Sequence, residues 1–242
     1  MNPFQPRLLP HSLPNRDIRW QDGSLKHTAR LPCGIPGQGP HGPRYIEFHK
    51  EINTAYVVNE LGCTVSVFAF DVDAAADLVS GKAKDVHTLT MIQSISTVPE
   101  GFPTSLNTCS RIAIHPTQRF VFVGNRGHDS IAVFKVHRSA QGRLSHVDFF
   151  HTMGKCPRHF QFDRSGKWMV TVNQDTDSLA TFEFHHSTGK LSFTGTQMHC
   201  PSPNFACIFT PYSTETGNDL YYSNFRQGNG IAHAGTTGKS KL

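Results

Sequence analysis

The chain has 242 residues, of which 37% are hydrophobic, enough for the core of one large domain. Its formal net charge is +5, but no lysine- and arginine-rich run and no nucleic-acid motif accompany that charge, so we expect no nucleic-acid partner. The six cysteines include no Cys-x-x-Cys pair, and we expect free thiols in a reducing compartment.

The chain begins with a proline-rich stretch. Residues 1–21 carry four prolines among polar residues, which disfavours helix and leaves no apolar segment for secretion or for membrane spanning. We expect an irregular lead-in there and no membrane partner. A Gly-x-Leu turn at residues 22–25 matches turns at 142–144 and 189–191, and it predicts the outer strand of a partial preceding unit.

A short apolar run followed by Asn and one more residue then occurs four times. The Asn residues lie 66, 48 and 51 positions apart. Each of the first three is followed nine residues later by a Phe that closes a second β-rich run, and such runs bounded by turn residues favour strands over helices. The four runs are Tyr56-Val57-Val58-Asn59-Glu60, Phe122-Val123-Gly124-Asn125-Arg126, Val170-Thr171-Val172-Asn173-Gln174 and Tyr221-Tyr222-Ser223-Asn224-Phe225.

A period near 50 residues made of four short strands predicts an all-β fold, the β-propeller, in which each blade packs between neighbours. We expect the first blade to have three strands within residues 41–70 and an outer strand at 89–96, separated by an inserted loop with one helical turn. The second blade is expected at about 107–151, the third at about 157–199, and a fourth begins at residues 203–205. The count is three full and two partial blades, in a domain of residues 22–227 followed by a flexible tail, 228–242.

Several motifs resemble the lactonase family of seven-bladed propellers over about residues 22–210. This family includes bacterial-type 6-phosphogluconolactonases and carboxy-cis,cis-muconate cyclases. The strings that carry the resemblance are Gly42-Pro43-Arg44, Val58-Asn59-Glu60-Leu61, Asn125-Arg126-Gly127-His128-Asp129-Ser130 and Pro157-Arg158-His159-Phe160.

The resemblance implies hydrolysis of a sugar lactone, with 6-phosphogluconolactone of the pentose phosphate pathway as the first substrate. Two alternatives stay open: a non-catalytic propeller binding module or inactive short form, and a muconate-type lactone cyclase. No cofactor is expected. Because the family has seven blades, we also consider a homo-oligomer that completes the ring.

Equivalent repeat positions supply the candidate site. Arg44 and Arg158 occupy one position in two blades, and Glu60 and Arg126 occupy the position after the Asn in two blades, so we expect them at one mouth. Guanidinium groups suit the anionic oxygens of a phosphate or carboxylate. The same residues can instead pair simply to bridge blades.

Hydrolysis also needs an oxyanion stabiliser and a base. We expect Arg126 or Arg158 to serve as the first. The base candidates are His159, His128 and Glu60, and arginines beside Glu60 would make it the weakest of these.

The other histidines give weaker evidence for a functional site. No metal-binding spacing occurs among the fifteen, so no metal site is expected. His49 and His115 occupy equivalent positions beside a strand-to-strand turn, and we expect both to stabilise that turn rather than to form a site.

The last three residues, Ser240, Lys241 and Leu242, form the tripeptide read by the peroxisomal import receptor. We therefore expect a peroxisomal protein, with a cytoplasmic location as the alternative.

Overall fold

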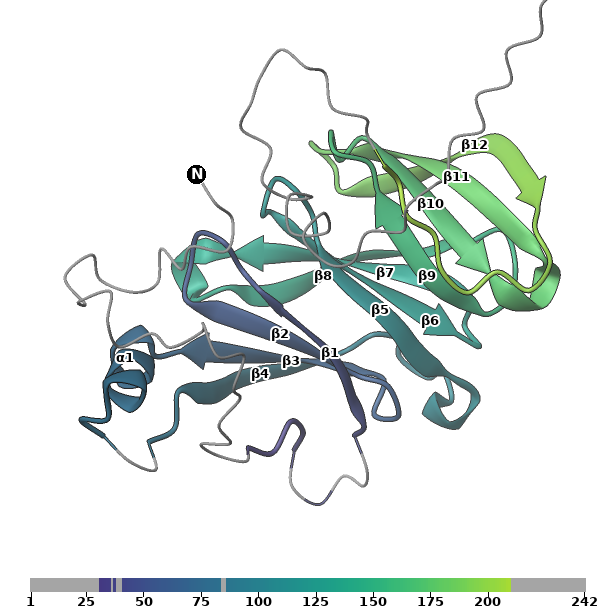
Figure 1. Ribbon diagram of the computed structural model, residues 1–242. Coiled ribbons are helices and arrows are strands. Elements are labelled where there is room, and N and C mark those ends of the chain that lie inside the picture. The colour runs from purple at the N-terminus through teal and green to yellow at the C-terminus, as the bar shows by residue number, and fades with distance from the viewer. Residues whose placement is uncertain (1–30, 36, 38–40, 84–85, 210–242) are drawn as a thin grey trace, which may run out of the picture. The chain divides into compact units, whose positions relative to one another are not determined.

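Four-stranded antiparallel sheets make up the fold, and each sheet takes its strands in chain order (Figure 1). The computed structural model describes residues 31–35, 37, 41–83 and 86–209, and these ranges hold three such sheets. The first comprises β1 (Pro43–Phe48), β2 (Thr54–Asn59), β3 (Thr64–Phe70) and β4 (Leu89–Ser96). The second comprises β5 (Thr108–Ile114), β6 (Phe120–Arg126), β7 (Ser130–His137) and β8 (Arg143–His151), and the third comprises β9 (Pro157–Phe162), β10 (Trp168–Asn173), β11 (Ser178–His185) and β12 (Lys190–His199).

These sheets are the three full blades that the repeat predicts, and the propeller prediction is confirmed. The first strands of adjacent blades contact each other, β1 with β5 and β5 with β9, as expected of innermost strands. Residues 203–209, where a fourth blade was expected to begin, form no strand, because no described strand offers them a hydrogen-bonding partner. The partial blade expected from residue 22, the lead-in and the tail lie outside the described residues.

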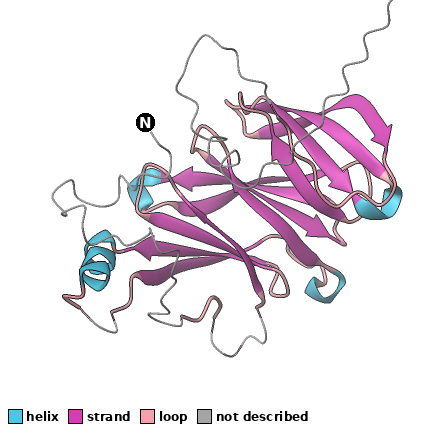
Figure 2. Cartoon of the chain, in the orientation of Figure 1, coloured by secondary structure: helices cyan, strands magenta, loops and turns pink. Residues whose placement is uncertain are grey.

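The insertion in the first blade is a helix, α1 (Val72–Ser80), which is longer than the single turn that the sequence suggested (Figure 2). Asp71 caps its N-terminus, since its side chain accepts a 2.9 Å hydrogen bond from the Ala74 amide. Gly81 ends the helix with φ of 75°, a left-handed conformation that glycine adopts without strain. Three short 3₁₀ turns, η2 (Thr104–Leu106), η3 (Arg138–Ala140) and η4 (Gln174–Thr176), join strands elsewhere.

Because side chains alternate along β6, this one strand packs against both the first and the third blade. Val121 and Val123 pack in a core cluster shared with the first blade, and Phe120 and Phe122 pack in a cluster shared with the third. Successive strand residues point to opposite faces, so a strand covered on both sides is apolar throughout. The strand β6 therefore has no polar face, and every residue of β6 before Arg126 is buried.

Two buried histidines join neighbouring blades at equivalent positions. His49 Nε2 lies 2.8 Å from the carbonyl oxygen of Gln118, and His115 Nε2 lies 2.8 Å from that of Gly166. Because a carbonyl only accepts, each Nε2 carries the proton and donates. The Nδ1 atoms accept amide hydrogen bonds from their own turns, as the sequence led us to expect, but the contact with the next blade was not predicted.

Candidate functional site

The Asn that ends the second strand of each blade is completely buried and ties its hairpin to a neighbouring loop. Asn59 Nδ2 donates to Thr64 Oγ1 and to Ser66 Oγ, both at 2.9 Å. Asn173 Nδ2 donates to the Thr152 carbonyl at 2.9 Å. These bonds fix the backbone at the point where the next residue leaves the strand, so the side chain after each Asn is placed by a buried anchor.

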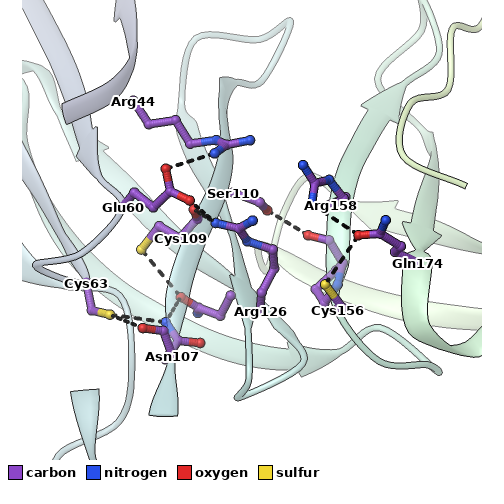
Figure 3. Close-up of polar contacts among 12 residues, drawn as sticks. Arg44, Glu60, Cys63, Asn107, Cys109, Ser110, Arg126, Cys156, Arg158 and Gln174 are labelled. Carbon is purple, nitrogen blue, oxygen red and sulfur yellow. Dashed lines mark hydrogen bonds and ion pairs between the residues drawn. The ribbon is translucent and has the colours of Figure 1, made fainter. Parts of the chain in front are cut away.

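Two arginines from adjacent blades bind the two oxygens of one carboxylate (Figure 3). Arg44 Nη1 donates to Glu60 Oε2 at 2.8 Å, and Arg126 Nη2 donates to Glu60 Oε1. Arg126 Nη2 also donates to the carbonyl oxygen of Cys109 at 3.0 Å. The structure thus brings together three of the residues that the sequence selected. We call Arg44, Glu60 and Arg126 the Arg-Glu-Arg cluster.

The charges of this cluster hold Glu60 in its ionised form. Partial burial raises the pKa of Glu60, but the hydrogen bonds and positive charges of Arg44 and Arg126 outweigh burial and bring the pKa below its usual value. The Glu60 side chain keeps 28% of its surface exposed and Arg126 keeps 12%, so solvent reaches the carboxylate. Two guanidinium groups against one carboxylate leave the cluster with a net positive charge.

A buried polar network that sequence reasoning missed lies under the cluster. The Cys109 amide donates to the Glu60 carbonyl at 2.9 Å, which joins the turn after β2 of the first blade to the start of β5 in the second. Asn107 Nδ2 lies within hydrogen-bond distance of Cys63 Sγ (3.3 Å) and of Asn125 Oδ1 (3.2 Å). A hydrogen bond from Cys109 lowers the pKa of the Cys63 thiol. No sequence signal marks Asn107, because its partners lie in both blades.

Arg158 lies in the third blade and has a neutral partner. Its Nη1 donates to Gln174 Oε1 at 3.1 Å, and Gln174 is the residue after the third Asn, equivalent to Glu60 and Arg126. Burial raises the pKa of the Cys156 thiol, and the charges of Arg126 and Arg158 both oppose this rise, so both guanidinium groups lie within electrostatic range of that sulfur. Gln174 ends the third repeated run, so its position in the repeat identifies it, although it was not among the predicted site residues.

His159 is 2% exposed and faces Arg111 of the second blade rather than an open mouth. Arg111 Nη1 contacts His159 Nε2, and since guanidinium only donates, Nε2 must accept. Burial lowers the pKa of His159 to about 4, with a further contribution from the charge of Arg111. The ring is therefore neutral, and the lone pair that a base would need is occupied. Phe205 covers the ring, with the two centroids 4.2 Å apart.

His128, the other histidine expected as a base, stabilises a turn. Its Nδ1 lies 2.7 Å from Ser130 Oγ, and its ring packs edge-on against Phe102 and Phe149. Burial lowers the pKa of His128. Within the described part of the chain, neither His128 nor His159 forms a hydrogen bond with the Arg-Glu-Arg cluster, so Glu60 is the base candidate that lies between the arginines.

Within the described ranges, no set of three His, Cys, Asp or Glu side chains is arranged to hold a metal ion. All six cysteines, which lie in those ranges, are free thiols. None of the helices described there is both long enough and apolar enough to cross a membrane. What the cluster offers chemically is a carboxylate and guanidinium donors around a common point, an arrangement that binds anionic oxygens.

Comparison with known proteins agrees with this architecture. Residues 20–209 match the family described as lactonase, 7-bladed beta-propeller. A 6-phosphogluconolactonase of Bacillus subtilis is 37% identical over 186 residues, which cover 73% of this chain and 49% of the relative. An uncharacterized protein of Staphylococcus aureus is 36% identical over 152 residues, covering 62% of this chain and 40% of the relative. The chain thus spans about half the length of the curated relatives it matches.

Solved structures give the same result. A periplasmic gluconolactonase of Pseudomonas aeruginosa superposes with a TM-score of 0.58 at 26% identity, covering 71% of this chain and 43% of that one. A protein of Lactobacillus plantarum superposes with a TM-score of 0.59 at 25% identity, covering 68% and 44%.

Proposed function

Because the chain belongs to the lactonase family of seven-bladed β-propellers, we propose that it hydrolyses a sugar lactone at the Arg-Glu-Arg cluster, with 6-phosphogluconolactone as the substrate. The observation that carries this proposal is the Glu60 carboxylate held between guanidinium groups of two blades. The names of the relatives support the reaction: one is a 6-phosphogluconolactonase and another a gluconolactonase.

The reaction opens a ring ester. Water attacks the carbonyl carbon, the carbonyl oxygen becomes a tetrahedral oxyanion, and the ring C–O bond breaks to leave a carboxylic acid and a hydroxyl group. The transition state gains negative charge on that oxygen, so donors aimed at it accelerate the step. Arg126 is suited to this role, because Glu60 and the Cys109 carbonyl fix its guanidinium through Nη2, and its Nη1 makes no hydrogen bond within the described part of the chain.

Glu60 is the base in this proposal. Each carboxylate oxygen has two acceptor sites, so a water can bind beside each arginine contact. The lowered pKa makes Glu60 a weak base, but it keeps the carboxylate ionised at neutral pH. The histidines that the sequence favoured are engaged elsewhere: His159 accepts from Arg111, and His128 bonds Ser130.

The experiment is hydrolysis of freshly made 6-phosphoglucono-δ-lactone by the purified full chain, measured above spontaneous hydrolysis. We expect saturable turnover, and Arg126→Ala should lower kcat by about 10²- to 10³-fold, as loss of an oxyanion donor does. Arg138→Ala is the matched control, since Arg138 pairs with Glu51 on an exposed surface. A folded protein without turnover, or an Arg126→Ala variant as active as the control, would refute the proposal.

A further inference from the structure

The arginines at equivalent positions in the first and third blades have partners of different charge. In the first blade, Arg44 donates to the carboxylate of Glu60 at 2.8 Å. In the third, Arg158 donates to the amide oxygen of Gln174 at 3.1 Å. The repeat position is the same and each arginine donates through Nη1, but the accepting group is a carboxylate in one blade and a neutral amide in the other. An arginine stays protonated in proteins, and an amide accepts its hydrogen bond without neutralising it.

Gln174 is fixed in the orientation that this contact needs. Its backbone amide donates to the Cys156 carbonyl at 3.0 Å, and its Nε2 donates to Ser202 Oγ at 3.4 Å. The two side-chain contacts assign opposite ends of the amide, with the oxygen toward Arg158 and the NH₂ toward Ser202. Gln174 therefore holds the guanidinium in place through Nη1.

The rest of the Arg158 guanidinium remains available. No carboxylate lies within ion-pair distance of Arg158 in the described part of the chain, and its Nε–H and Nη2–H groups have no hydrogen-bond partner there. The nearby negative charges are Asp129 and the exposed Asp175: burial and these two carboxylates raise the pKa of the Cys156 thiol, whereas Arg126 and Arg158 lower it, and neither carboxylate contacts Arg158. Two or more free N–H donors on one planar cation match the oxygens of a phosphate monoester.

We propose that Gln174 determines substrate specificity: by positioning Arg158 without neutralising it, Gln174 makes Arg158 the binding group for the phosphate of a phosphorylated sugar lactone. The lactone ring then lies toward Arg126 and Glu60. This inference rests on the proposed function, because it assigns a binding group to the phosphate end of the substrate whose lactone ring reacts at the Arg-Glu-Arg cluster.

The test compares two lactones that differ only in the phosphate, 6-phosphoglucono-δ-lactone and glucono-δ-lactone, with the full chain. The measured quantity is the ratio of their kcat/KM values. Gln174→Glu adds a carboxylate of the same shape beside Arg158, as in the first blade, and should lower this ratio by about 10- to 100-fold. Gln174→Met leaves the guanidinium charged but removes the hydrogen bond that positions it, so it should lower the ratio less than Gln174→Glu does, whereas Arg158→Met should lose the preference.

Asp175→Asn is the matched control for a charge change in the same loop, and its ratio should equal or exceed that of wild type. A Gln174→Glu variant that keeps the wild-type ratio, with a wild-type circular dichroism spectrum, overturns the proposal. A Gln174→Met variant whose kcat/KM ratio falls as far as that of Gln174→Glu also overturns the proposal, since the hydrogen bond and not the charge would then determine the preference.

Calorimetric binding of the two reaction products separates this inference from the proposed function. Wild type should bind 6-phosphogluconate more tightly than gluconate, and Gln174→Glu should remove that difference. If wild type hydrolysed neither lactone but showed this pattern, the proposed function would fail while the phosphate assignment stood. Equal affinity of wild type for both products would overturn the assignment.

Discussion

Replacing His115 by Gln tests how adjacent blades are joined. His115 is completely buried, donates to the Gly166 carbonyl of the next blade, and packs against Phe162 and Phe184. Burial is the main cause that lowers its pKa to about 4; the charge of the neighbouring His186 adds to this effect, and Asp163 and the hydrogen bond to Gly166 oppose it.

The sign of the pH effect follows from that lowered pKa. The unfolded chain binds a proton at about pH 6.5, whereas the folded chain resists it down to about pH 4. The stabilisation is therefore complete above pH 6.5 and is lost as pH falls toward 4. The full difference corresponds to about 3 kcal/mol, of which about 2 kcal/mol is lost between pH 7 and pH 5.

The assay is urea unfolding of wild type and His115→Gln at both pH values. The variant should be less stable at pH 7 by about 1–3 kcal/mol, since Gln keeps an amide donor but loses the ring packing against Phe162 and Phe184 and the Nδ1 acceptor of the Thr117 amide. Between pH 7 and pH 5, however, it should lose about 2 kcal/mol less than wild type. His185→Gln is the control, because His185 is exposed and bonds Ser192 within its own blade. If His115→Gln lost as much stability as wild type over this range, the reasoning would be wrong.

Three further predictions concern the supports of the site and its base. Asn125→Ala removes a buried side chain that joins Thr97 and Ser130, and should lower the free energy of unfolding by about 2–4 kcal/mol in chemical denaturation. Asp71→Ala removes the cap of α1 and should cost about 1 kcal/mol in the same assay while leaving lactone turnover unchanged; a loss of turnover would show that the insertion serves the site. With Glu60 as base, kcat/KM for glucono-δ-lactone, which has no titrating phosphate, should stay constant from pH 8 to pH 5 and fall only at lower pH, where the carboxylate is protonated; an inflection near pH 6.5 would indicate a histidine instead.

Local patterns were sufficient to predict the strands. The outer strand expected at residues 89–96 is observed as β4 with the same bounds, and the other blades begin and end within a residue or two of expectation. Period-2 alternation and turn residues are local properties, which is why they can be read without a structure. The helix in the insertion was underestimated because its cap, Asp71, lies outside the alanine-rich stretch that suggested it.

The site was predictable where the repeat gave equivalent positions. Arg44, Glu60 and Arg126 were selected on that ground, and the structure joins them. The environment of His159 was not predictable, since it depends on Arg111, 48 residues away in another blade. The intrinsic pKa of histidine favours it as a base, but a contact between blades determines whether the lone pair of His159 is free.

The most direct test of the central claim is turnover of 6-phosphoglucono-δ-lactone by Glu60→Gln, measured beside wild type and beside Glu51→Gln. Both substitutions remove one carboxylate from the first blade, but Glu51 pairs with Arg138 on an exposed surface. The account predicts that Glu60→Gln lowers kcat by about 10²- to 10⁴-fold while Glu51→Gln keeps wild-type activity. Wild-type turnover by a folded Glu60→Gln protein would contradict it.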